Sequence, residues 1–224
     1  MNFLHGTRES LSAAEFRALA SYRHGVFVRQ LGWPIGTPNG LELDEFDEPN
    51  TEYVVAVKPD GRVGGCARLL PTTRPYLLQR VFPHLLAGER PPQDPQVWEL
   101  SRFAAVDLEA RRGDDPQLKA LRSGQILLTS VLRAAALGAK RLLTVSPLGI
   151  ERLLRRMGAH AHRAGPPCMV SGEPVFACWI ELDVTTLSAL SCYAPMPAAA
   201  TAPAECPPAP SHPPLMTTQP SLIC

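Results

Sequence analysis

Hydrophobic and polar positions change their period along the chain, and each period predicts a different element. After Ser12 and Glu15, which have the spacing of a capping box, apolar residues recur at roughly helical spacing up to about residue 29. This spacing predicts an N-terminal helix. Residues 31–50 lose the pattern and contain Gly, Pro and Asn, so we expect a long loop there, and long ordered loops often carry function.

Three short apolar runs in the centre of the chain are strand candidates. Residues 52–58 and 62–70 are joined by a Pro-Asp-Gly turn, which predicts a β-hairpin, and residues 97–106 form the third run. Gly64 and Gly65 interrupt the second run. Glycine inside a strand indicates a bulge or the close approach of another backbone.

The C-terminal half alternates between helical and extended patterns. We expect an apolar helix over residues 117–139, a buried strand over 141–145 and a last strand pair between 168 and 182. Ser146 and Pro147 have the residue types of an N-cap and first helical position, which predicts another helix up to about residue 157. The order of elements predicts a mixed sheet with helices on its faces, an α/β sandwich.

Composition separates one folded unit from a C-terminal tail. The stretch after residue 190 is rich in Pro, Ala and Thr and has no apolar periodicity, so we expect a single domain over residues 1–190 and a disordered tail over 191–224. A net charge of +1 indicates no broad nucleic-acid surface, and no apolar run approaches the ~18 residues of a membrane span. Six scattered cysteines and an N-terminus unlike a signal peptide predict a cytoplasmic protein with reduced thiols.

An acidic stretch, LELDEFDEPN at residues 41–50, places Asp44, Glu45, Asp47 and Glu48 within five positions. It could be a solvated loop or one wall of a site for a cationic ligand. A metal site is the poorer explanation, because the stretch lacks the Gly turn and spacing of a calcium loop. The histidines are also dispersed along the chain. We therefore expect no metal.

Charged residues also interrupt two apolar strands. Glu99 and Arg102 lie in the segment WELSRF, and Arg68 lies in CARLL. Burying such charges is costly unless they are paired, and the simpler alternative is an edge strand whose side chains reach solvent. Strand alternation puts Glu99 and Ser101 on one face and Arg102 on the other, so a direct Glu99–Arg102 pair would require a bulge.

Two helices carry arginines that could be functional or simply solvated. Arg23 lies one helical turn before Phe27. In GIERLLRRMG, the residues Arg152, Arg155 and Arg156 share one helix face, either as a solvated surface or as a docking patch for an acidic partner.

Four segments together closely resemble the acyl-homoserine-lactone synthases, the autoinducer synthases of bacterial quorum sensing. They are YRHGVFVRQLGW, LDEFDEPNTEYVVA, GGCARLLPTTRPYLLQRVFPHLL and WELSRFAA, and they cover about residues 20–106. The family's charged and aromatic signature falls on Arg23, Phe27, Trp33, Asp44, Asp47, Arg68, Phe82, Glu99 and Arg102. The resemblance implies a fold like that of the GCN5-related acetyltransferases, an α/β/α sandwich with a mixed, mostly antiparallel central sheet.

The resemblance also implies a reaction with two substrates, S-adenosylmethionine (SAM) and a fatty acyl thioester on acyl carrier protein. The amine of SAM attacks the thioester, and the SAM carboxylate then attacks its own γ-carbon, which closes the lactone and expels methylthioadenosine. No further cofactor is implied, and we expect a monomer. The residue types suit this chemistry, since carboxylates beside aromatic rings favour a cation and a buried carboxylate such as Glu99 can act as a general base.

The expected roles fall into four groups. We expect Glu99, Arg102, Asp44, Asp47 and Arg68 to carry catalysis, and Arg23, Phe27, Trp33, Asp44, Asp47, Phe82 and Phe103 to bind SAM. We expect Ser101, Thr144 and Met169 to contact the acyl chain, and Arg152, Arg155 and Arg156 to dock the carrier protein. Within the acidic stretch, Asp44 and Asp47 should face inward, while Glu45 and Glu48 remain solvated.

Two other functions fit the same fold class. A coenzyme A-dependent N-acetyltransferase would need a glycine-rich loop at a helix start to hold pyrophosphate, and LRSGQIL offers a single glycine. A non-enzymatic binding protein would leave the charges of the strand WELSRF without a purpose. The acyltransferase hypothesis explains more of the residues.

Overall fold

A computed structural model describes residues 1–36, 38–110 and 115–194. Eight strands form one sheet in the order β1-β2-β3-β4-β5-β8-β6, with β7 paired to β8. The strands are β1 (Asn2–Thr7), β2 (Glu52–Val57), β3 (Val63–Pro71), β4 (Val97–Ala104), β5 (Arg141–Pro147), β6 (Ala161–Arg163), β7 (Cys168–Val170) and β8 (Glu173–Glu181). The β4–β5 pair is parallel and the others are antiparallel, which confirms the mixed sheet expected from the sequence.

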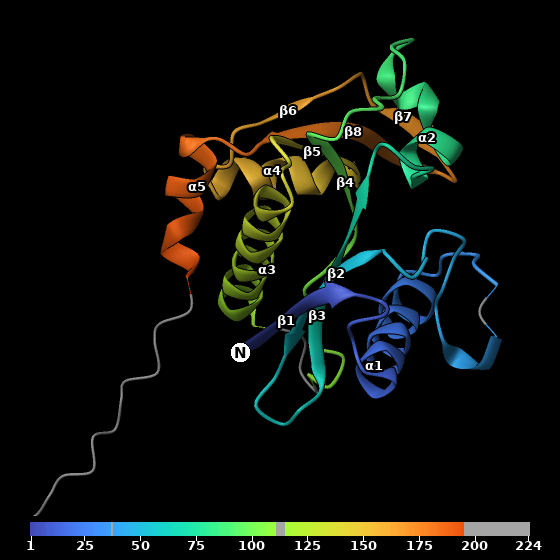
Figure 1. The fold of residues 1–224 in the computed structure, drawn as a ribbon, viewed down its shortest axis with the longest axis vertical. Helices are drawn as coiled ribbons and strands as arrows, with labels where there is room; N and C mark the ends of the chain where they lie inside the picture. The colour runs from blue at the N-terminus through green and yellow to red at the C-terminus, as the bar shows by residue number, and fades with distance from the viewer. Residues whose placement is uncertain (37, 111–114, 195–224) are drawn as a thin grey trace, which may run out of the picture.

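Helices cover both faces of the sheet, and Figure 1 shows α1 and α3 on opposite sides of the strands. The helices are α1 (Ala13–Arg23), α2 (Leu77–Val81), α3 (Pro116–Ala136), α4 (Leu148–Arg156) and α5 (Val184–Leu190). Short 3-10 segments at Pro38–Gly40, Pro83–Leu86 and Ser191–Tyr193 and a π-helix at His24–Gln30 complete the described elements. No described helix is long and apolar enough to cross a membrane.

The core is divided between the two faces. Ile126 of α3 and Leu154 of α4 pack with sheet residues such as Leu69 on one face, which we call the α3 side. On the opposite face, the α1 side, Leu19 of α1 belongs to one apolar cluster and Leu78 of α2 to another. The layered α/β/α arrangement expected from the family resemblance is therefore confirmed.

The N-terminal helix changes its winding where the site begins. Ser12 caps α1, and the predicted capping box with Glu15 is present. From His24 to Gln30 the chain continues as a π-helix, so the helical segment does extend to about the predicted end, but with a wider turn. Short π-helical segments occur frequently at functional sites.

Several boundaries differ from the sequence-based expectation. Strand β1 and helix α5 were not predicted, because both are short and carry weak periodicity. Strand β5 continues to Pro147, which serves as the N-cap of α4, so the predicted helix start at Ser146 is wrong.

The folded unit also extends beyond residue 190. Ser191–Tyr193 form a 3-10 helix, and the ring of Tyr193 lies so close to Gly124 of α3 that a Cβ there would be 2.2 Å from it. Residues 195–224, which hold most of the predicted tail, lie outside the described residues.

Two β-bulges shape the sheet. Gly64 is left unpaired between the Ala56–Gly65 and Val57–Val63 pairs, which is the bulge, one of the two alternatives expected at the two glycines. The second bulge was not predicted. The pairs Arg68–Ser101 and Cys66–Ala104 leave two residues of β4 opposite one of β3, and Arg102 takes a φ of 51°.

The two central strands separate after a short paired stretch. Val97–Glu99 pair with Arg141–Leu143, while both strands continue beyond the last pair. The separation leaves room between the end of β4 and the end of β5, and the candidate site lies there.

Candidate active site

Three arginines and three carboxylates form a buried ion-pair network on the α1 side of the sheet. Arg23 comes from α1, Arg68 from β3 and Arg102 from β4, while the loop before β2 contributes Glu42, Asp44 and Asp47. Arg23 and Arg68 are 1% and 0% exposed, so neither arginine lies on a solvated face or at an edge position. Because the six formal charges balance, the network can be buried without a net charge.

Asp47 is the most heavily bonded member of the network. Its carboxylate accepts hydrogen bonds from Arg23 Nη1 at 2.7 Å, Arg23 Nη2 at 3.0 Å and Arg68 Nη1 at 3.2 Å. The Tyr53 hydroxyl and the Asp44 backbone N–H add bonds of 2.7 and 2.8 Å. Burial alone would raise the pKa of Asp47, but the Arg23 and Arg68 guanidiniums outweigh it and hold the pKa well below its usual range.

Asp44 and Glu42 each bridge two arginines. The Asp44 carboxylate accepts from Arg68 Nη1 at 2.5 Å and from Arg102 Nη2 at 2.7 Å. Glu42 accepts from Arg23 Nε and, at 2.9 and 3.0 Å, from Arg102 Nη2 and Nε. The Asp44 side chain is 17% exposed and Glu42 is fully buried, so Asp44 is the network carboxylate nearest to solvent.

The acidic stretch is oriented as predicted. Asp47 is buried and Asp44 half-buried, whereas Glu45 and Glu48 are exposed. Glu42 was not among the predicted site residues, although it stands two residues before Asp44 with Leu43 between them. That alternation was the available signal, since residues two apart in an extended segment share a face.

The network lies between the two apolar clusters of the α1 side. Along β3, Cys66 belongs to the α1 cluster and Leu70 to the α2 cluster, and Arg68 stands between them. Phe46, from the acidic stretch, packs into the α2 cluster and lies 5.7 Å from the Arg68 guanidinium. The fold therefore holds the charges between two apolar walls, where Coulomb interactions are strong.

The bulge at Arg102 corrects the expected orientation of that side chain. Simple alternation would point it to the α3 side, away from Glu99 and Ser101. The positive φ instead turns it toward Glu42 and Asp44. The bulge that a direct Glu99–Arg102 pair would require is present, but among the described residues Arg102 pairs with the loop carboxylates Glu42 and Asp44 instead.

Glu99 is buried against the start of α2. It is 1% exposed, and its carboxylate accepts hydrogen bonds from the backbone N–H groups of Leu77 and Leu78 at 2.9 and 2.7 Å. Burial raises the pKa of Glu99 to about 7, and the two backbone hydrogen bonds and the charge of Arg68 limit the rise. A carboxyl with such a pKa can exchange a proton near neutral pH.

Two aromatic rings lie beside the network. Phe27 from the π-helix and Trp33 from the following loop are stacked with centroids 4.8 Å apart. The Arg102 guanidinium lies 5.6 Å from the Phe27 ring and 5.4 Å from the Trp33 ring. These rings can therefore bind a cation, and in this structure Arg102 is that cation.

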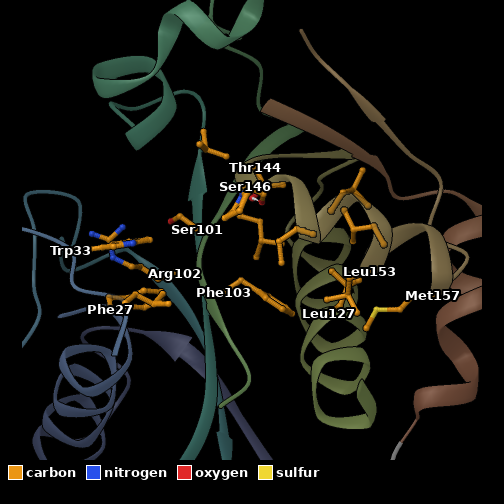
Figure 2. A pocket seen from close by; sticks show the side chains of 17 residues that line it. Phe27, Trp33, Ser101, Arg102, Phe103, Leu127, Thr144, Ser146, Leu153 and Met157 are labelled. Carbon is orange, nitrogen blue, oxygen red and sulfur yellow. Dashed lines mark hydrogen bonds between the residues drawn. The ribbon is translucent and has the colours of Figure 1, made fainter. Parts of the chain in front are cut away.

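A pocket of about 210 Å³ opens where β4 and β5 separate. Figure 2 shows Phe27, Trp33 and Arg102 on one side of Ser101, and Thr144, Ser146, Leu153 and Met157 on the other. The second side is mostly apolar, with one hydroxyl pair at Thr144 and Ser146, whose Oγ atoms are 3.3 Å apart. The pocket thus joins a charged aromatic end to an apolar end.

The predicted binding residues do not all line this pocket. Phe27, Trp33, Ser101, Phe103 and Thr144 do, although Phe103 packs on the α3 side. Phe82 lies instead at the end of α2, in the apolar cluster of that helix.

Met169 was wrongly assigned to the acyl-chain wall. It is 67% exposed on β7, which pairs only with β8 in the described sheet. The hydrophobic side chain alone suggested a pocket wall, but Met169 faces solvent while Cys168 of the same strand packs against the α2 cluster.

Helix α4 has two distinct faces. Ile150, Leu153 and Met157, at its C-cap, line the pocket, whereas Arg152, Arg155 and Arg156 are exposed. These three arginines, the arginine face, surround a surface recess together with Gly149. One helix therefore separates the apolar pocket from a cationic surface.

The described residues contain no group of three or more His, Cys, Asp or Glu side chains arranged to hold a metal ion.

Comparison with known proteins shows that this chain is similar to autoinducer synthases. The family model for autoinducer synthases matches residues 8–190. The acyl-homoserine-lactone synthase of Acinetobacter nosocomialis is 48% identical over 183 residues, which cover 81% of this chain and 100% of that protein. TofI, solved in a ternary complex with an inhibitor and MTA, is 44% identical with a TM-score of 0.75, covering 85% of this chain and 96% of its own.

Two further structures extend the likeness. BjaI, described as a CoA-dependent acyl-homoserine lactone synthase and solved with SAM and isopentyl-CoA, is 27% identical with a TM-score of 0.73 over 84% of this chain and 85% of its own. A protein from Lactobacillus plantarum named as an N-acetyltransferase is 20% identical with a TM-score of 0.53, covering 81% of this chain and 98% of its own. The last similarity concerns the fold alone and agrees with the acetyltransferase-like fold.

Proposed function

The chain belongs to the autoinducer synthase family and is an acyl-homoserine-lactone synthase, and on that premise we propose that it joins SAM to an acyl thioester carried by acyl carrier protein. The products would be the acylated lactone, methylthioadenosine and the free thiol of the carrier. The observation that carries the proposal is the pocket itself, because it connects a charged aromatic end to an apolar end through Ser101.

The charged aromatic end suits SAM. SAM carries an ammonium, a sulfonium and a carboxylate, and therefore needs both signs of charge in its site. Asp44 is the partly exposed carboxylate of the network, and Arg102 is the arginine that lines the pocket. The stacked rings of Phe27 and Trp33 could accept the sulfonium through cation–π attraction, worth on the order of 1 kcal/mol or more when desolvated.

The remaining network residues act as positioning groups in this proposal. Arg23 and Arg68 hold Asp47 and Asp44 from behind, and Glu42 holds Arg102. Such a preorganised set fixes the charges before the substrate arrives, which lowers the reorganisation needed during reaction. Phe82, further away in the α2 cluster, would support the wall rather than touch SAM.

Glu99 is the proposed general base. The SAM ammonium must lose a proton before its nitrogen can attack, and Glu99 can take that proton directly or through a water molecule. The nitrogen lone pair then forms a bond to the thioester carbonyl carbon, the carbon–sulfur bond breaks, and the second proton of the nitrogen passes to the leaving thiolate. The carboxylate of the acylated SAM next attacks its own γ-carbon, and the sulfonium departs as neutral methylthioadenosine.

The apolar end would hold the acyl chain, with Thr144 beside it as a hydroxyl able to contact a 3-oxo group. The arginine face suits an acidic carrier protein, since clustered arginines bind carboxylates and phosphates. Acyl-coenzyme A is the alternative acyl donor, because the similar protein BjaI is described as CoA-dependent.

One assay tests the proposal. Purified protein is mixed with SAM and with acyl carrier protein or coenzyme A loaded with chains of four to fourteen carbons. We expect methylthioadenosine release and an acyl-homoserine lactone identified by mass spectrometry, with faster turnover from the carrier protein. Absence of product with every donor would contradict the proposed reaction, and faster turnover from coenzyme A would contradict the choice of donor.

A further inference from the structure

We propose that the Ser101 hydroxyl donates the hydrogen bond that stabilises the oxyanion formed on the thioester carbonyl during acylation. The inference rests on the proposed function and adds a catalytic residue to it. It also replaces the expectation, natural from a bulged strand, that backbone amides alone supply this stabilisation.

Ser101 lies where the two ends of the pocket meet. It lines the pocket from β4 and is 8% exposed. Figure 2 shows it between the Trp33–Arg102 side and the Thr144–Ser146 side. If SAM occupies the first side and the acyl chain the second, the thioester carbon must lie close to this residue.

The hydroxyl has one defined partner and a free hydrogen. Ser101 Oγ accepts a hydrogen bond of 3.0 Å from Arg68 Nε. No described residue accepts a hydrogen bond from Ser101 Oγ, so its hydrogen can rotate toward the pocket. A hydroxyl that accepts from a cation is polarised, and its own O–H becomes a stronger donor.

Arg68 provides a positive charge directly behind this hydroxyl. It is fully buried, and its Nη2 is the buried side-chain atom without a hydrogen-bond partner in the described part of the chain. In a planar guanidinium Nε–H and one Nη2–H share an edge, so this unpaired nitrogen lies beside Ser101 Oγ. The uncompensated N–H therefore adds positive potential where negative charge would develop.

The proposed base and oxyanion donor are arranged on one strand. Glu99 and Ser101 are two residues apart on β4 and share its α1 side, as their partners on β3, Leu70 and Arg68, also do. Two residues of a strand span roughly 7 Å. This separation allows one group to take the proton of the amine while the other contacts the carbonyl oxygen of the same reacting centre.

Glu99, Ser101 and solvent account for every proton and electron pair of the acylation step. Glu99 removes a proton from the ammonium, and the nitrogen lone pair attacks the carbonyl carbon. The π electrons of the carbonyl group move to its oxygen, and the resulting oxyanion accepts a hydrogen bond from the Ser101 hydroxyl. When the carbonyl reforms, the carbon–sulfur bond breaks, the nitrogen of the new amide passes its second proton to the leaving thiolate, and Glu99 then releases the first proton to solvent.

The competing role for Ser101 is recognition of a 3-oxo group on the acyl chain. The two roles differ in substrate dependence, because every thioester forms the oxyanion but only a substituted chain carries the second oxygen. The test compares wild type with Ser101→Ala and Ser101→Thr in single-turnover acylation. Each enzyme is given an unsubstituted and a 3-oxo acyl carrier protein of equal chain length.

We expect Ser101→Ala to slow acylation by about 100-fold with both donors, as for loss of one oxyanion donor. The dissociation constant of SAM, measured by calorimetry, should stay within about threefold, a shift under 1 kcal/mol. Ser101→Thr keeps a hydroxyl and should recover most of the rate. Ser130→Ala is the matched control, since Ser130 is a fully buried serine on α3 that does not line the pocket.

Three results would overturn the inference. They are an unchanged rate in Ser101→Ala, a loss confined to the 3-oxo donor, and a loss accompanied by equally weakened SAM binding or a lowered melting temperature. The proposed function is tested separately by wild type in the same experiment. If wild type forms no product, the reaction itself is wrong, whereas an active wild type with an equally active Ser101→Ala removes only the role of Ser101.

Discussion

Replacing Asp47 with Asn is the sharpest test of the buried ion-pair network. The substitution keeps the shape of the side chain but removes the negative charge that two buried guanidiniums share. It also places an amide N–H₂ where the carboxylate accepts bonds from Arg23, Arg68 and Tyr53. At least one of those donors then loses its acceptor and the network carries a net positive charge.

The magnitude follows from the burial of the partners. Arg23 and Arg68 are almost inaccessible to solvent, so water cannot replace the lost carboxylate. Removing one partner of a buried pair costs about 3–5 kcal/mol of unfolding free energy. At about 2–4 °C per kcal/mol for a domain of this size, the melting temperature should fall by roughly 6–20 °C.

The effect should also depend on pH, and the sign can be worked out. The pKa of Asp47 is depressed in the folded state, so its contribution to stability is present above its unfolded pKa of about 4. The contribution is lost as pH falls below that value toward the folded pKa. The difference in unfolding free energy between wild type and Asp47→Asn should therefore be largest near neutral pH and shrink in acid.

Urea denaturation at pH 7 and at pH 3.5 measures both effects. Glu48→Gln is the matched control, because Glu48 is the exposed neighbour of Asp47 in the same stretch, and it should change the unfolding free energy by less than about 0.5 kcal/mol. The reasoning is refuted if Asp47→Asn is as stable as Glu48→Gln at pH 7, or if its deficit is the same at both pH values.

Three further predictions concern catalysis and binding. Because the pKa of Glu99 lies at about 7 and the base must be ionised, kcat/KM should rise with pH through about 7. Glu99→Gln should abolish that rise and should slow acylation more than it weakens SAM binding. A turnover similar to that of wild type in this variant would exclude Glu99 as the base. Reversing the charge of the arginine face should raise KM for acyl carrier protein several-fold and leave SAM binding unchanged, and an unaltered KM would indicate a merely solvated surface. Met157→Ala enlarges the apolar end of the pocket, so it should shift the products to longer acyl chains and lower the unfolding free energy by about 2–5 kcal/mol. Met169→Ala, at an exposed position, should leave the product distribution as in wild type. Mass spectrometry of the lactones distinguishes the two outcomes.

The charges of the three arginines and three carboxylates balance, and this limits how the acidic stretch can bind a cation. Its carboxylates do not present a free negative surface to a cation, since each of the three in the network is already paired with arginine. Arg102 lines the pocket and is bonded to the partly exposed Asp44, so the pair brings both signs of charge to this end of the site. In a substrate with an ammonium and a carboxylate, the ammonium can pair with Asp44 and the carboxylate with Arg102. The exchange then leaves no charge of the substrate or of the protein unpaired.

The sequence by itself determined much of the fold and the direction of individual side chains. Hydrophobic periodicity reports which side of an element faces a core, and it therefore predicted the central strands and long helix. The family resemblance, rather than alternation, separated the inward pair Asp44 and Asp47 from the solvated pair Glu45 and Glu48, since positions 44 and 47 are three apart. The interruption of an apolar strand by glycine indicated the bulge at Gly64, one of the two outcomes expected there.

Only the tertiary structure decided how the charges combine. Arg102 faces Glu42 because a bulge with positive φ turns it across the sheet, and a non-glycine residue carries no sequence signal for that conformation. Met169 is outside the core because β7 is a short strand beside β8, a matter of sheet order rather than of hydrophobicity. Arg102 and Glu42 are 60 positions apart, so their contact depends on strand register and loop path, which local patterns do not contain.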